Sequence, residues 1–513
     1  MDHVIGVDIG TQSTKALLTD ANGRIVASSS QGYHPDTPRP RWAEQWPDVW
    51  LDAVVACMAR CVAQAPGVPI AALCISSLYG GSGIPVDAEL RPLHPCLIWM
   101  DRRATAEVDW IRANVDVARL GALTHNGIDS YYGCTKMLWL QRNRPDVWAR
   151  TRWLLPPNAY VIAKLTGEVA VDHSSAGNIG GIYDMERRAW SDEMLGALGM
   201  PATLMPERLV QSSDVVGRVL PDWAARLGVP AGTPVVAGGV DAAMATLAAS
   251  ATRPGQHVAM IGTSMCWGMI VPSGTRAGDA QHPLVTMPHV INGMHDQYVF
   301  GGASTAGACI AWFLEQFSTA EPTGTAGAPD LLAQLDAASA DVAAGSNGVV
   351  FLPYLMGERS PLWDAKASGA FVGLSLYHTR AHLYRAVLEG VTFALRHNIE
   401  TGRSAGLERL DDELIVVGGA ARSDLWMQIV ADVTGYPVLT IAEDVEAALG
   451  AALLAAFGVD LASMEAVRKG WVTLERRADP RAATKAAYDR TFGAYVGLYP
   501  ALRTSMHRLH DAG

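Results

Sequence analysis

The sequence has little of several features that would assign it to a simple class. It has 7 cysteines, an odd number without a Cys-x-x-Cys pair, which argues against a disulfide framework and favours a reducing, cytoplasmic location. The longest purely apolar run, Ala447 to Val459, is shorter than the ~20 residues of a membrane span. No basic and apolar leader follows Met1, so nothing indicates export. Basic residues are the minority, 40 against 51 acidic ones, which argues against nucleic acid or an anionic membrane as partner.

Length and composition favour a folded protein of more than one domain. The 513 residues exceed the roughly 100–200 residues of an average domain, which suits two large domains or three average ones. Hydrophobic residues make up 49% and charged residues 18%, enough apolar material for large cores. The 50 glycines and 28 prolines supply many tight turns. We therefore expect an α/β protein.

The first thirty residues have the pattern of a three-stranded antiparallel meander. The expected strands are Val4–Asp8, Lys15–Thr19 and Ile25–Ser28. Asn22-Gly23 is a strong hairpin signal between the last two. A helix is expected from Pro47 to about Ala65, and a buried strand at Ile70–Ser76.

A similar order of strand, small-residue turn and strand recurs about 250 residues later. Strands are expected at His257–Ile261 and Cys266–Ile270, with Gly262-Thr263-Ser264 as the turn between them. The sequences barely match, so the repetition is one of supersecondary structure. We interpret it as an internal duplication, in which each of two α/β lobes brings one hairpin to a shared cleft.

The first turn, Gly10-Thr11-Gln12-Ser13-Thr14, follows an acid, Asp8, at the end of a strand. Such a turn can offer N–H and hydroxyl donors to a phosphate while the acid faces the counter-ion. The alternative is an ordinary hairpin with a capping aspartate. No Walker motif and no Gly-x-Gly-x-x-Gly after a strand occurs, so neither a P-loop nor a dinucleotide site is supported.

Asp241 stands where an expected strand, Pro234–Ala237, and the turn Gly238-Gly239 lead into an Ala-rich helix, Ala242–Ala251. Aspartate is favoured as a helix N-cap, which is the structural explanation. The functional explanation is that Asp241 accepts a proton from a substrate hydroxyl, while the helix N-terminus faces a transferring phosphoryl group. One residue can serve in both ways.

Two further patterns were weighed for chemistry. Gly418-Gly419 after an apolar strand lets a nucleotide approach the backbone, although such turns are usually structural. His378 and His382 are four residues apart, but Thr379 is expected to cap a helix, Arg380–Asn398, so we interpret both histidines as structural.

Together these segments resemble the FGGY family of carbohydrate kinases. The most specific stretch runs from Phe351-Leu-Pro-Tyr-Leu-Met-Gly-Glu-Arg-Ser-Pro361 through Gly369-Ala-Phe-Val-Gly-Leu374 to Arg385-Ala-Val-Leu-Glu-Gly390. The resemblance implies ATP-dependent enzymes of the actin-like, ribonuclease-H-like ATPase fold, with two domains flanking a central cleft. It implies an N-terminal domain at 1–251 with the sugar site, a nucleotide-binding domain at 252–460 and a C-terminal helical extension at 461–513.

The resemblance also implies roles for single residues. Asp241 matches the catalytic aspartate, and Asp8 the acid that holds Mg²⁺. The positions that match ATP-binding residues are Thr11, Gln12, Gly262, Thr263, Trp312, Gly418, Gly419, Ala420 and Ser423. Those that match the sugar site are Leu78, Tyr79, Gly80, Asp101 and Asp241.

The xylulokinase subfamily has the most similar overall pattern, through Trp42-Ala-Glu-Gln45 and Thr135-Lys-Met-Leu-Trp139. However, its usual Gln-Met-His-Gly is Leu78-Tyr-Gly-Gly81 here, and Asp241-Ala242 is closer to ribulokinases. The implied reaction is phosphorylation of an open-chain pentulose, D-xylulose to D-xylulose 5-phosphate first. The alternatives are D-ribulose, a linear polyol such as ribitol or erythritol, or a non-catalytic actin-like ATPase module. Family resemblance also suggests a homodimer.

Overall fold

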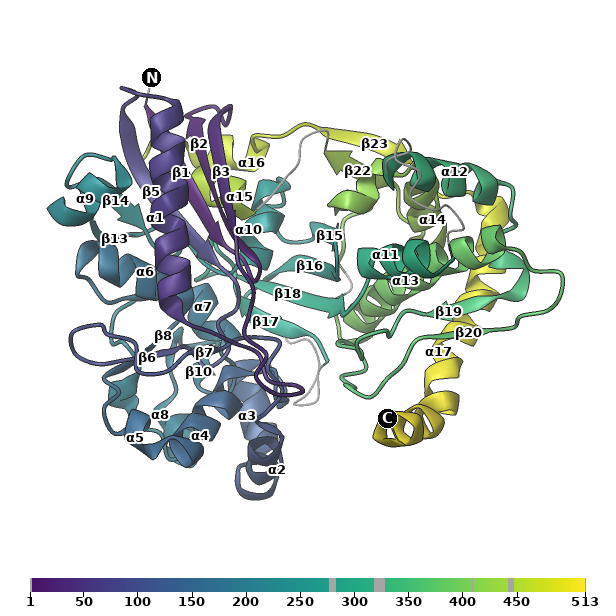
Figure 1. Ribbon diagram of the computed structural model, residues 1–513, viewed down its shortest axis with the longest axis horizontal. Helices are drawn as coiled ribbons and strands as arrows, with labels where there is room; N and C mark the ends of the chain where they lie inside the picture. Colours follow the sequence, from purple (N-terminus) through teal and green to yellow (C-terminus); the bar gives the residue numbers. More distant parts are fainter. Residues whose placement is uncertain (1, 276–282, 318–327, 408, 442–446, 513) are drawn as a thin grey trace. The chain divides into compact units, whose positions relative to one another are not determined.

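The computed structural model describes residues 2–275, 283–317, 328–407, 409–441 and 447–512 (Figure 1). Its contacts divide the chain into two compact units. Unit 1 comprises residues 1–254, 270–299 and 445–472. Unit 2 comprises residues 255–269, 300–444 and 473–513. The domain limits expected from the sequence stay a prediction beside these contact units.

Unit 1 is built on a six-stranded sheet in the order β13-β14-β5-β1-β2-β3. These strands are β1 (His3–Ile9), β2 (Ser13–Asp20), β3 (Ile25–Gly32), β5 (Ile70–Ser77), β13 (Val215–Arg218) and β14 (Pro234–Val236). The first three form the predicted antiparallel meander. β5 lies parallel to both β1 and β14, so a central parallel trio carries the meander on one side.

Helices cover both faces of this sheet because its strands alternate in what they bury. Ile5 and Val7 of β1 share a core cluster with Trp50 and Val54 of α1 (Pro47–Gln64). The intervening Gly6 faces α15 (Ala447–Gly458), where an added Cβ would lie 2.1 Å from a helix carbonyl. The absence of a side chain at position 6 therefore allows α15 to pack directly on β1.

The remaining elements of unit 1 surround the sheet (Figure 1). Its helices are α2 (Thr105–Asn114), α3 (Val117–Thr124), α4 (Gly133–Asn143), α5 (Pro145–Trp148), α6 (Pro157–Thr166), α7 (His173–Asn178), α8 (Asp192–Ala197), α9 (Pro221–Leu227), α10 (Asp241–Ala248) and α16 (Met464–Lys469). Its short strands are β4 (Glu44–Gln45), β6 (Ile84–Val86), β7 (Cys96–Leu97), β8 (Trp153–Leu155), β9 (Val171–Asp172), β10 (Tyr183–Asp184), β11 (Ala189–Trp190), β12 (Leu209–Val210) and β17 (Val285–Pro288).

Unit 2 repeats the central topology of unit 1. Its strands run in the order β16-β15-β21-β22-β23. They are β15 (His257–Ile261), β16 (Met265–Pro272), β21 (Leu414–Val417), β22 (Val438–Ile441) and β23 (Leu474–Ala478). β15 is antiparallel to β16 and parallel to β21, as β1 is antiparallel to β2 and parallel to β5. The predicted duplication of supersecondary structure is therefore present. β16 and β18 (Asp296–Ala303) have residues in both units.

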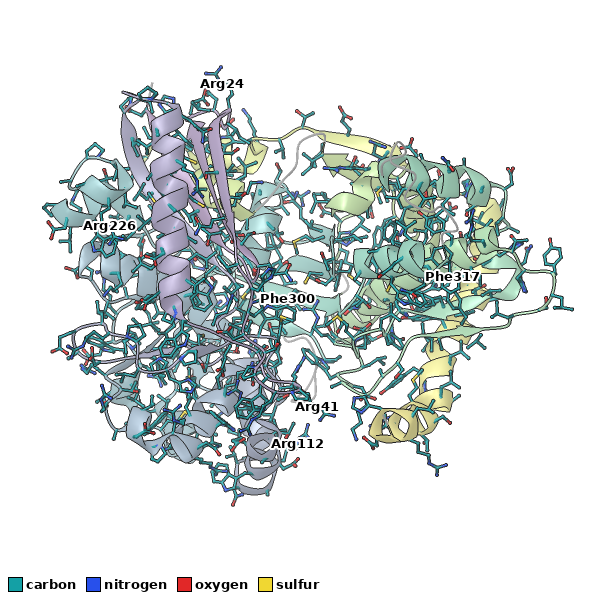
Figure 2. The ribbon with its side chains drawn as sticks, viewed as in Figure 1. Arg24, Arg41, Arg112, Arg226, Phe300 and Phe317 are labelled. Atoms are coloured by element: carbon teal, nitrogen blue, oxygen red, sulfur yellow. The ribbon has the colours of Figure 1, made fainter. Side chains whose placement is uncertain are left out.

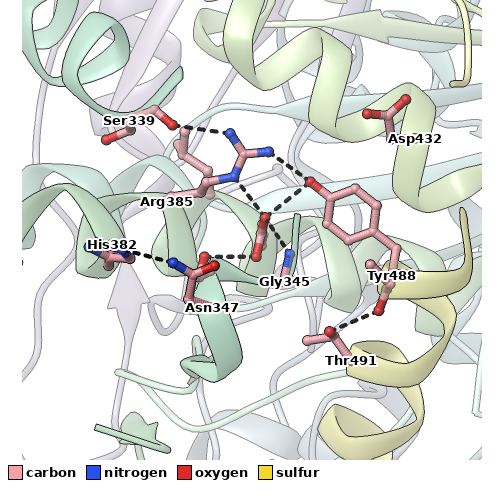
Figure 3. A network of polar contacts seen from close by, with 12 residues as sticks. Ser339, Gly345, Asn347, His382, Arg385, Asp432, Tyr488 and Thr491 are labelled. Atoms are coloured by element: carbon pink, nitrogen blue, oxygen red, sulfur yellow. Dashed lines mark hydrogen bonds and ion pairs between the residues drawn. The ribbon is translucent and has the colours of Figure 1, made fainter. Parts of the chain in front are cut away.

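The helices of unit 2 are α11 (Gly307–Phe317), α12 (Ala328–Ala340), α13 (Arg380–Ser404), α14 (Asp424–Thr434) and α17 (Ala482–Ala512), and two further strands are β19 (Val350–Leu352) and β20 (Ala370–Val372). A buried ion pair on α13 contacts two of the other helices (Figure 3). Arg385 Nε lies 2.9 Å from Glu389 Oε1, one turn along α13, and its other nitrogens donate to Ser339 O and to the hydroxyl of Tyr488 on α17. Both charged groups of the pair also make hydrogen bonds to other residues, so the pair links α13 to α12 and α17.

The surface of unit 1 carries its arginines at separate places. Figure 2 shows Arg24, Arg112 and Arg226 at different edges of the unit, and all three are exposed. Arg24 follows β2, whereas Arg112 lies in α2 and Arg226 in α9. Among the described residues, no helix is long and apolar enough to cross a bilayer.

Candidate functional site

The first hairpin joins β1 to β2 as predicted. The last strand pair is Ile9 with Thr14, and Gly10 N donates to Ser13 O at 2.9 Å to close the turn. Thr11 is half-buried and Gln12 is exposed, so both are accessible at the tip. Among the described residues, the N–H groups of Thr11 and Gln12 have no acceptor. This is the arrangement of backbone donors that binds anions.

Three side chains from other segments hold this hairpin. The Tyr33 hydroxyl donates to Gly10 O at 2.7 Å, and Gln45 Nε2 donates to Thr11 O at 3.1 Å. The Trp99 indole Nε1 donates to Thr11 Oγ1 at 3.0 Å. Sequence reasoning singled out Gln45 only as part of a family-like segment, and nothing in the sequence marked Trp99 or Tyr33 as supports of the hairpin.

Asp8 lies at the end of β1, next to the hairpin. In the sheet register it stands between Lys15 of β2 and Ser76 of β5. The Ser76 hydroxyl donates to Asp8 Oδ1 at 2.9 Å. The carboxylate is half-buried. A single carboxylate that keeps contact with solvent suits Mg²⁺, which usually retains several waters and takes further oxygens from phosphates.

Asp241 is the first residue of α10, and Val240 occupies the N-cap position. Asp241 Oδ1 accepts a hydrogen bond from Ala242 N at 2.7 Å, so the carboxylate is fixed at the helix N-terminus. The preceding Gly238 has a φ of +69°, and an added Cβ there would lie 2.0 Å from Ile75 O. Only glycine fits this turn, which directs the chain from β14 into α10.

A buried polar network lies under the same turn. Ser174 Oγ donates to Asp172 Oδ1 and accepts from Val240 N, and Asn158 Nδ2 donates to Asp172 Oδ2 at 2.9 Å. Ser77 N donates to Gly239 O at 3.1 Å. These contacts hold the residues directly before Asp241. Sequence reasoning missed Asn158, Asp172 and Ser174, because nothing in a single sequence marks a buried hydrogen-bond network.

The predicted sugar loop follows β5. Leu78 N donates to Ile9 O at 2.7 Å, which anchors the loop beside the first hairpin. The Tyr79 hydroxyl accepts from Gly133 N at 2.5 Å and donates to Ile179 O at 3.3 Å. Burial raises the pKa of Tyr79 well above its ordinary value, so the phenol stays neutral. Tyr79 thus fixes the loop through bonds to two other segments.

A small hollow of about 10 Å³, room for about one water molecule, lies against this loop. It is lined by Leu78, Tyr79, Gly80, Gly81, Gly83, Pro156, Ser175, Ile179 and Val240. Ser175 supplies the one side-chain hydroxyl of this lining besides the bonded phenol. Val240, the neighbour of Asp241, forms part of the wall. The hollow therefore connects the predicted sugar loop with the turn before α10.

Asp101 is completely buried and holds two segments together. Its Oδ2 accepts from Ala43 N at 2.7 Å, and its Oδ1 accepts from Arg103 N at 3.0 Å. The Arg103 guanidinium lies 2.7 Å from Asp101 Oδ2 and 2.6 Å from Glu44 Oε2, and 3.7 Å from the centre of the Trp42 ring. The geometry makes Asp101 an anchor of the 42–45 segment, while its predicted contact with a sugar stays a prediction.

Lys136 is a fully buried cation beside the same loop. Its Nζ donates to Tyr131 O at 2.7 Å and lies 5.9 Å and 5.8 Å from the ring centres of Tyr79 and Tyr131. Burial lowers its pKa to about 7, against the opposing attraction of Asp101. Arg102 pairs with Asp129 in the segment before α4. Both cations near the loop are therefore already in contact with protein oxygens.

The second hairpin joins β15 to β16 and closes with Gly262 N donating to Ser264 O at 3.0 Å. Gly307 N donates to Gly262 O at 2.8 Å, and Ala306 N and Ala308 N both donate to Thr263 O. Among the described residues, the N–H groups of Thr263 and Ser264 have no acceptor. The predicted Gly262 and Thr263 thus lie in a turn with outward donors, like the first hairpin.

The predicted adenosine turn follows β21. Gly418 has a φ of +96°, and a Cβ there would lie 2.6 Å from Ile261 O at the end of β15, so glycine is required. Gly419 has open space at its Cβ position, and Ala420 is buried. The Ser423 hydroxyl accepts from Trp426 N as the N-cap of α14 and donates to Asp336 at 2.6 Å.

Trp312 lies on α11, near the middle of the helix. Its ring is half-buried and stacks on Phe351 with a centroid distance of 6.3 Å and an interplanar angle of 14°. It also meets Phe317 edge-on at 5.5 Å. A partly exposed indole with a fixed ring plane is suited to contact a flat base.

The motif Gly-Glu-Arg-Ser-Pro supports the loop between β18 and α11. Glu358 Oε1 accepts from Ser304 N at 2.8 Å, and Ser360 Oγ accepts from Gly302 N at 2.7 Å. Glu358 Oε2 is buried without a hydrogen-bond partner among the described residues. Burial raises the pKa of Glu358 to about 7. The most specific family-like stretch thus holds the residues just before α11, and the start of α11 in turn binds the second hairpin.

His378, His382, Cys57 and Cys61 all make hydrogen bonds to backbone groups. His382 Nδ1 accepts from Thr379 N and His378 Nδ1 accepts from Ser375 N, so both rings cap backbone groups near the start of α13. The thiols of Cys57 and Cys61 donate to carbonyl oxygens of β2. No group of three or more His, Cys, Asp or Glu that could hold a metal occurs in the part of the chain that the structure describes.

These features define a two-domain sugar kinase, and comparison with known proteins agrees. The chain belongs to the FGGY family of carbohydrate kinases: residues 3–248 match its N-terminal domain and residues 257–459 its C-terminal domain. The xylulose kinase of Lactococcus lactis subsp. lactis (strain IL1403) is 30% identical over 517 residues, 99% of each chain. The gluconokinase of Bacillus subtilis (strain 168) is 29% identical over 458 residues, 88% of this chain and 86% of that one.

Solved structures give the same result. The crystal structure of xylulose kinase from Rhodospirillum rubrum matches with a TM-score of 0.87 and 31% identity, covering 98% of this chain and 100% of that chain. The predicted family, the predicted two-domain kinase fold and the predicted enzyme class are therefore confirmed. The roles of single site residues stay predictions.

Proposed function

We propose that this kinase transfers the γ-phosphoryl group of ATP to the terminal hydroxyl of an open-chain pentulose, with D-xylulose as the first substrate. The observation that carries the proposal is Asp241, fixed as the first residue of α10 by a glycine turn and a buried network. The near full-length similarity to xylulose kinases supports D-xylulose among the pentuloses.

Each unit has residues suited to ATP. In unit 1, the open N–H groups of Thr11 and Gln12 would bind phosphate oxygens, and Asp8 would hold Mg²⁺. In unit 2, Gly262 and Thr263 bind phosphate oxygens in the same manner. The residues proposed to contact adenosine are Trp312, Gly418, Gly419, Ala420 and Ser423. The bound metal supplies charge neutralisation of the phosphates.

Asp241 orients the sugar hydroxyl and accepts its proton as the oxygen attacks phosphorus. The α10 N-terminus directs its dipole toward the negative charge that develops there. Leu78, Tyr79 and Gly80 line the sugar through backbone and ring atoms, because the Tyr79 hydroxyl is engaged elsewhere. Asp101 contributes indirectly, because it anchors the 42–45 segment.

Gluconate is a further candidate substrate, ranked below the pentuloses and linear polyols, because gluconokinases are among the relatives. Its carboxylate requires a cation. Lys136 and Arg102 are the cations near the loop, and both already contact protein oxygens. D-Xylulose therefore stands first, followed by D-ribulose and then by linear polyols such as ribitol and erythritol. We also propose that the protein is cytoplasmic and forms a homodimer. Sedimentation of the purified protein tests the homodimer.

Replacement of Asp241 tests the proposal. Asp241→Asn is expected to lower sugar-dependent turnover by roughly 10²–10⁴-fold while nucleotide binding survives. Asp222→Asn is the matched control, since Asp222 is an exposed acid in the first turn of α9. A near-wild-type rate for Asp241→Asn would refute the assigned base. A coupled assay across pentuloses, hexuloses, polyols and aldonates identifies the sugar, and ATP turnover independent of any sugar would favour a non-catalytic ATPase module.

A further inference from the structure

The hydroxyl of Thr11 accepts a hydrogen bond and donates none among the described residues. Its oxygen accepts the indole N–H of Trp99 at 3.0 Å. A threonine hydroxyl has one proton to donate and two lone pairs to accept with. Among the described residues, nothing accepts the Thr11 proton. Because an N–H already points at the oxygen, the O–H bond must turn away from Trp99.

The carbonyl oxygens of the same hairpin are all occupied from within unit 1. Tyr33 supplies its hydroxyl to Gly10 O and its N–H to Gln12 O, at 2.7 Å and 2.9 Å. Gln45 supplies its amide Nε2–H to Thr11 O at 3.1 Å. The amide orientation of Gln45 follows from this contact, because only its nitrogen can face a carbonyl oxygen. The backbone groups of Thr11 and Gln12 that remain are N–H donors.

We propose that Trp99 is a positioning residue, which sets the direction of the Thr11 O–H bond so that this hydroxyl, like the N–H groups at the tip of the first hairpin, donates to a phosphoryl oxygen. Without the indole N–H, the Thr11 hydroxyl can rotate and present a lone pair to the phosphate, which repels it. With the N–H in place, the proton is directed outward before the nucleotide arrives, and no reorganisation is needed on binding. This inference rests on the proposed role of the hairpin in ATP binding.

A double-mutant cycle tests the coupling between the two residues. The ligand is a non-hydrolysable Mg-ATP analogue, with its dissociation constant measured by calorimetry on the full-length protein. Thr11→Val, which removes the hydroxyl, is expected to weaken binding by roughly tenfold or more, as for a hydrogen bond to a charged group. Trp99→Phe, which keeps a ring but loses the donor, is expected to weaken binding by about three- to tenfold.

The distinguishing result lies in the combinations. Trp99→Phe should have its full effect when combined with Thr11→Ser, which keeps a hydroxyl, and no effect when combined with Thr11→Val. Additive losses with Thr11→Val would overturn the proposal. So would a Trp99→Phe variant that raises the KM for sugar and leaves nucleotide binding unchanged, because Trp99 would then act on the sugar alone.

Trp190→Phe is the matched control. Trp190 also donates its indole N–H to an oxygen, Pro206 O at 2.8 Å, but has no contact with the hairpin. It should leave nucleotide affinity unchanged, and an equal loss there would show that any lost indole bond weakens the protein generally. If Thr11→Val itself leaves nucleotide binding intact, the hairpin does not bind phosphate and the proposed function loses that part of its site. If Thr11→Val does weaken nucleotide binding and the loss from Trp99→Phe simply adds to it, only the role of Trp99 is refuted.

Discussion

The two hairpins reach the same chemistry by different means. In both, the carbonyl oxygens accept bonds from inside the protein while N–H groups at the tip have no acceptor among the described residues. At the first hairpin, the side chains of Tyr33 and Gln45 make two of these bonds and backbone N–H groups make the other two, while the Trp99 indole donates to the Thr11 hydroxyl. At the second hairpin, backbone N–H groups at the start of α11 make them.

The difference teaches how each turn responds to substitution. Side-chain support can be removed one bond at a time, because each donor sits on a separate residue. Backbone support persists through most side-chain changes, but it requires the start of α11 to approach within hydrogen-bonding distance. Gly307 permits this approach, since a Cβ there would lie 2.7 Å from Gly262 O. The first hairpin is thus adjustable, and the second depends on one glycine.

The largest expected effect comes from breaking the backbone support. Gly307→Ala places a methyl group against Gly262 O, so the helix start or the hairpin must shift. Overpacking of this kind costs roughly 1–3 kcal/mol. We expect affinity for the Mg-ATP analogue to fall about tenfold, measured by calorimetry, together with a lower midpoint of thermal unfolding.

Gly493→Ala is the control for this substitution. Gly493 lies within α17, and its Cβ would meet nothing within 4 Å. Alanine there should stabilise the helix slightly and leave nucleotide affinity unchanged. If Gly307→Ala behaves in the same way, the second hairpin does not depend on close approach of α11.

An effect on the pH dependence of stability, rather than on nucleotide affinity, is expected from Glu358, the acid behind the second hairpin. The folded pKa of Glu358 is raised from 4.5 to about 7 by burial, so the folded state binds a proton more tightly than the unfolded state does. Its contribution to stability is therefore complete below about pH 4.5 and is lost as pH rises through about 7. We expect Glu358→Gln to remove up to about 3 kcal/mol of this pH dependence.

Denaturant unfolding at several pH values between 4.5 and 8 measures this slope. Gln keeps an oxygen that can accept from Ser304 N, so the loop should retain its support. Glu315→Gln, at an exposed position of α11, is the control and should leave the slope as it is in the unsubstituted protein. Identical slopes for Glu358→Gln and the unsubstituted chain would mean that Glu358 does not titrate in this range.

The smallest expected effect comes from removing one side-chain support of the first hairpin. Tyr33→Phe loses the bond to Gly10 O and keeps the N–H donated to Gln12 O. A net hydrogen bond contributes about 1 kcal/mol, and water can replace part of it at a half-buried site. We expect nucleotide affinity to fall about two- to fivefold by calorimetry. A loss larger than that of Gly307→Ala would reverse the ranking of the two hairpins.

Much of the fold could be predicted from local patterns. The strands of the opening meander, helix α1 and strand β5 lie within one or a few residues of their predicted limits. The hairpin turns were predicted from glycine and hydroxyl residues, and Asp241 from its place between a strand and a helix. These features depend on neighbouring residues along the chain, which a single sequence contains.

The supporting contacts could not be predicted in the same way. Trp99 meets Thr11 across 88 positions and Asn158 lies beneath the Asp241 turn through Asp172. The sugar contacts of Asp101 and Tyr79 stay predictions, and no sequence signal indicated the backbone groups that bind both side chains or the Arg103 guanidinium that pairs with Asp101. Which partner a side chain finds depends on how distant segments pack, and periodicity does not encode that.

By itself, the sequence determined where the chain turns, which faces its strands and helices bury, and which family it belongs to. Tertiary structure alone decided that the carbonyl oxygens of the hairpins are occupied and that their N–H groups point outward. The physical reason is that turn formation is a local property of glycine and hydroxyl residues, whereas the polarity of a turn depends on donors that packing brings from remote segments.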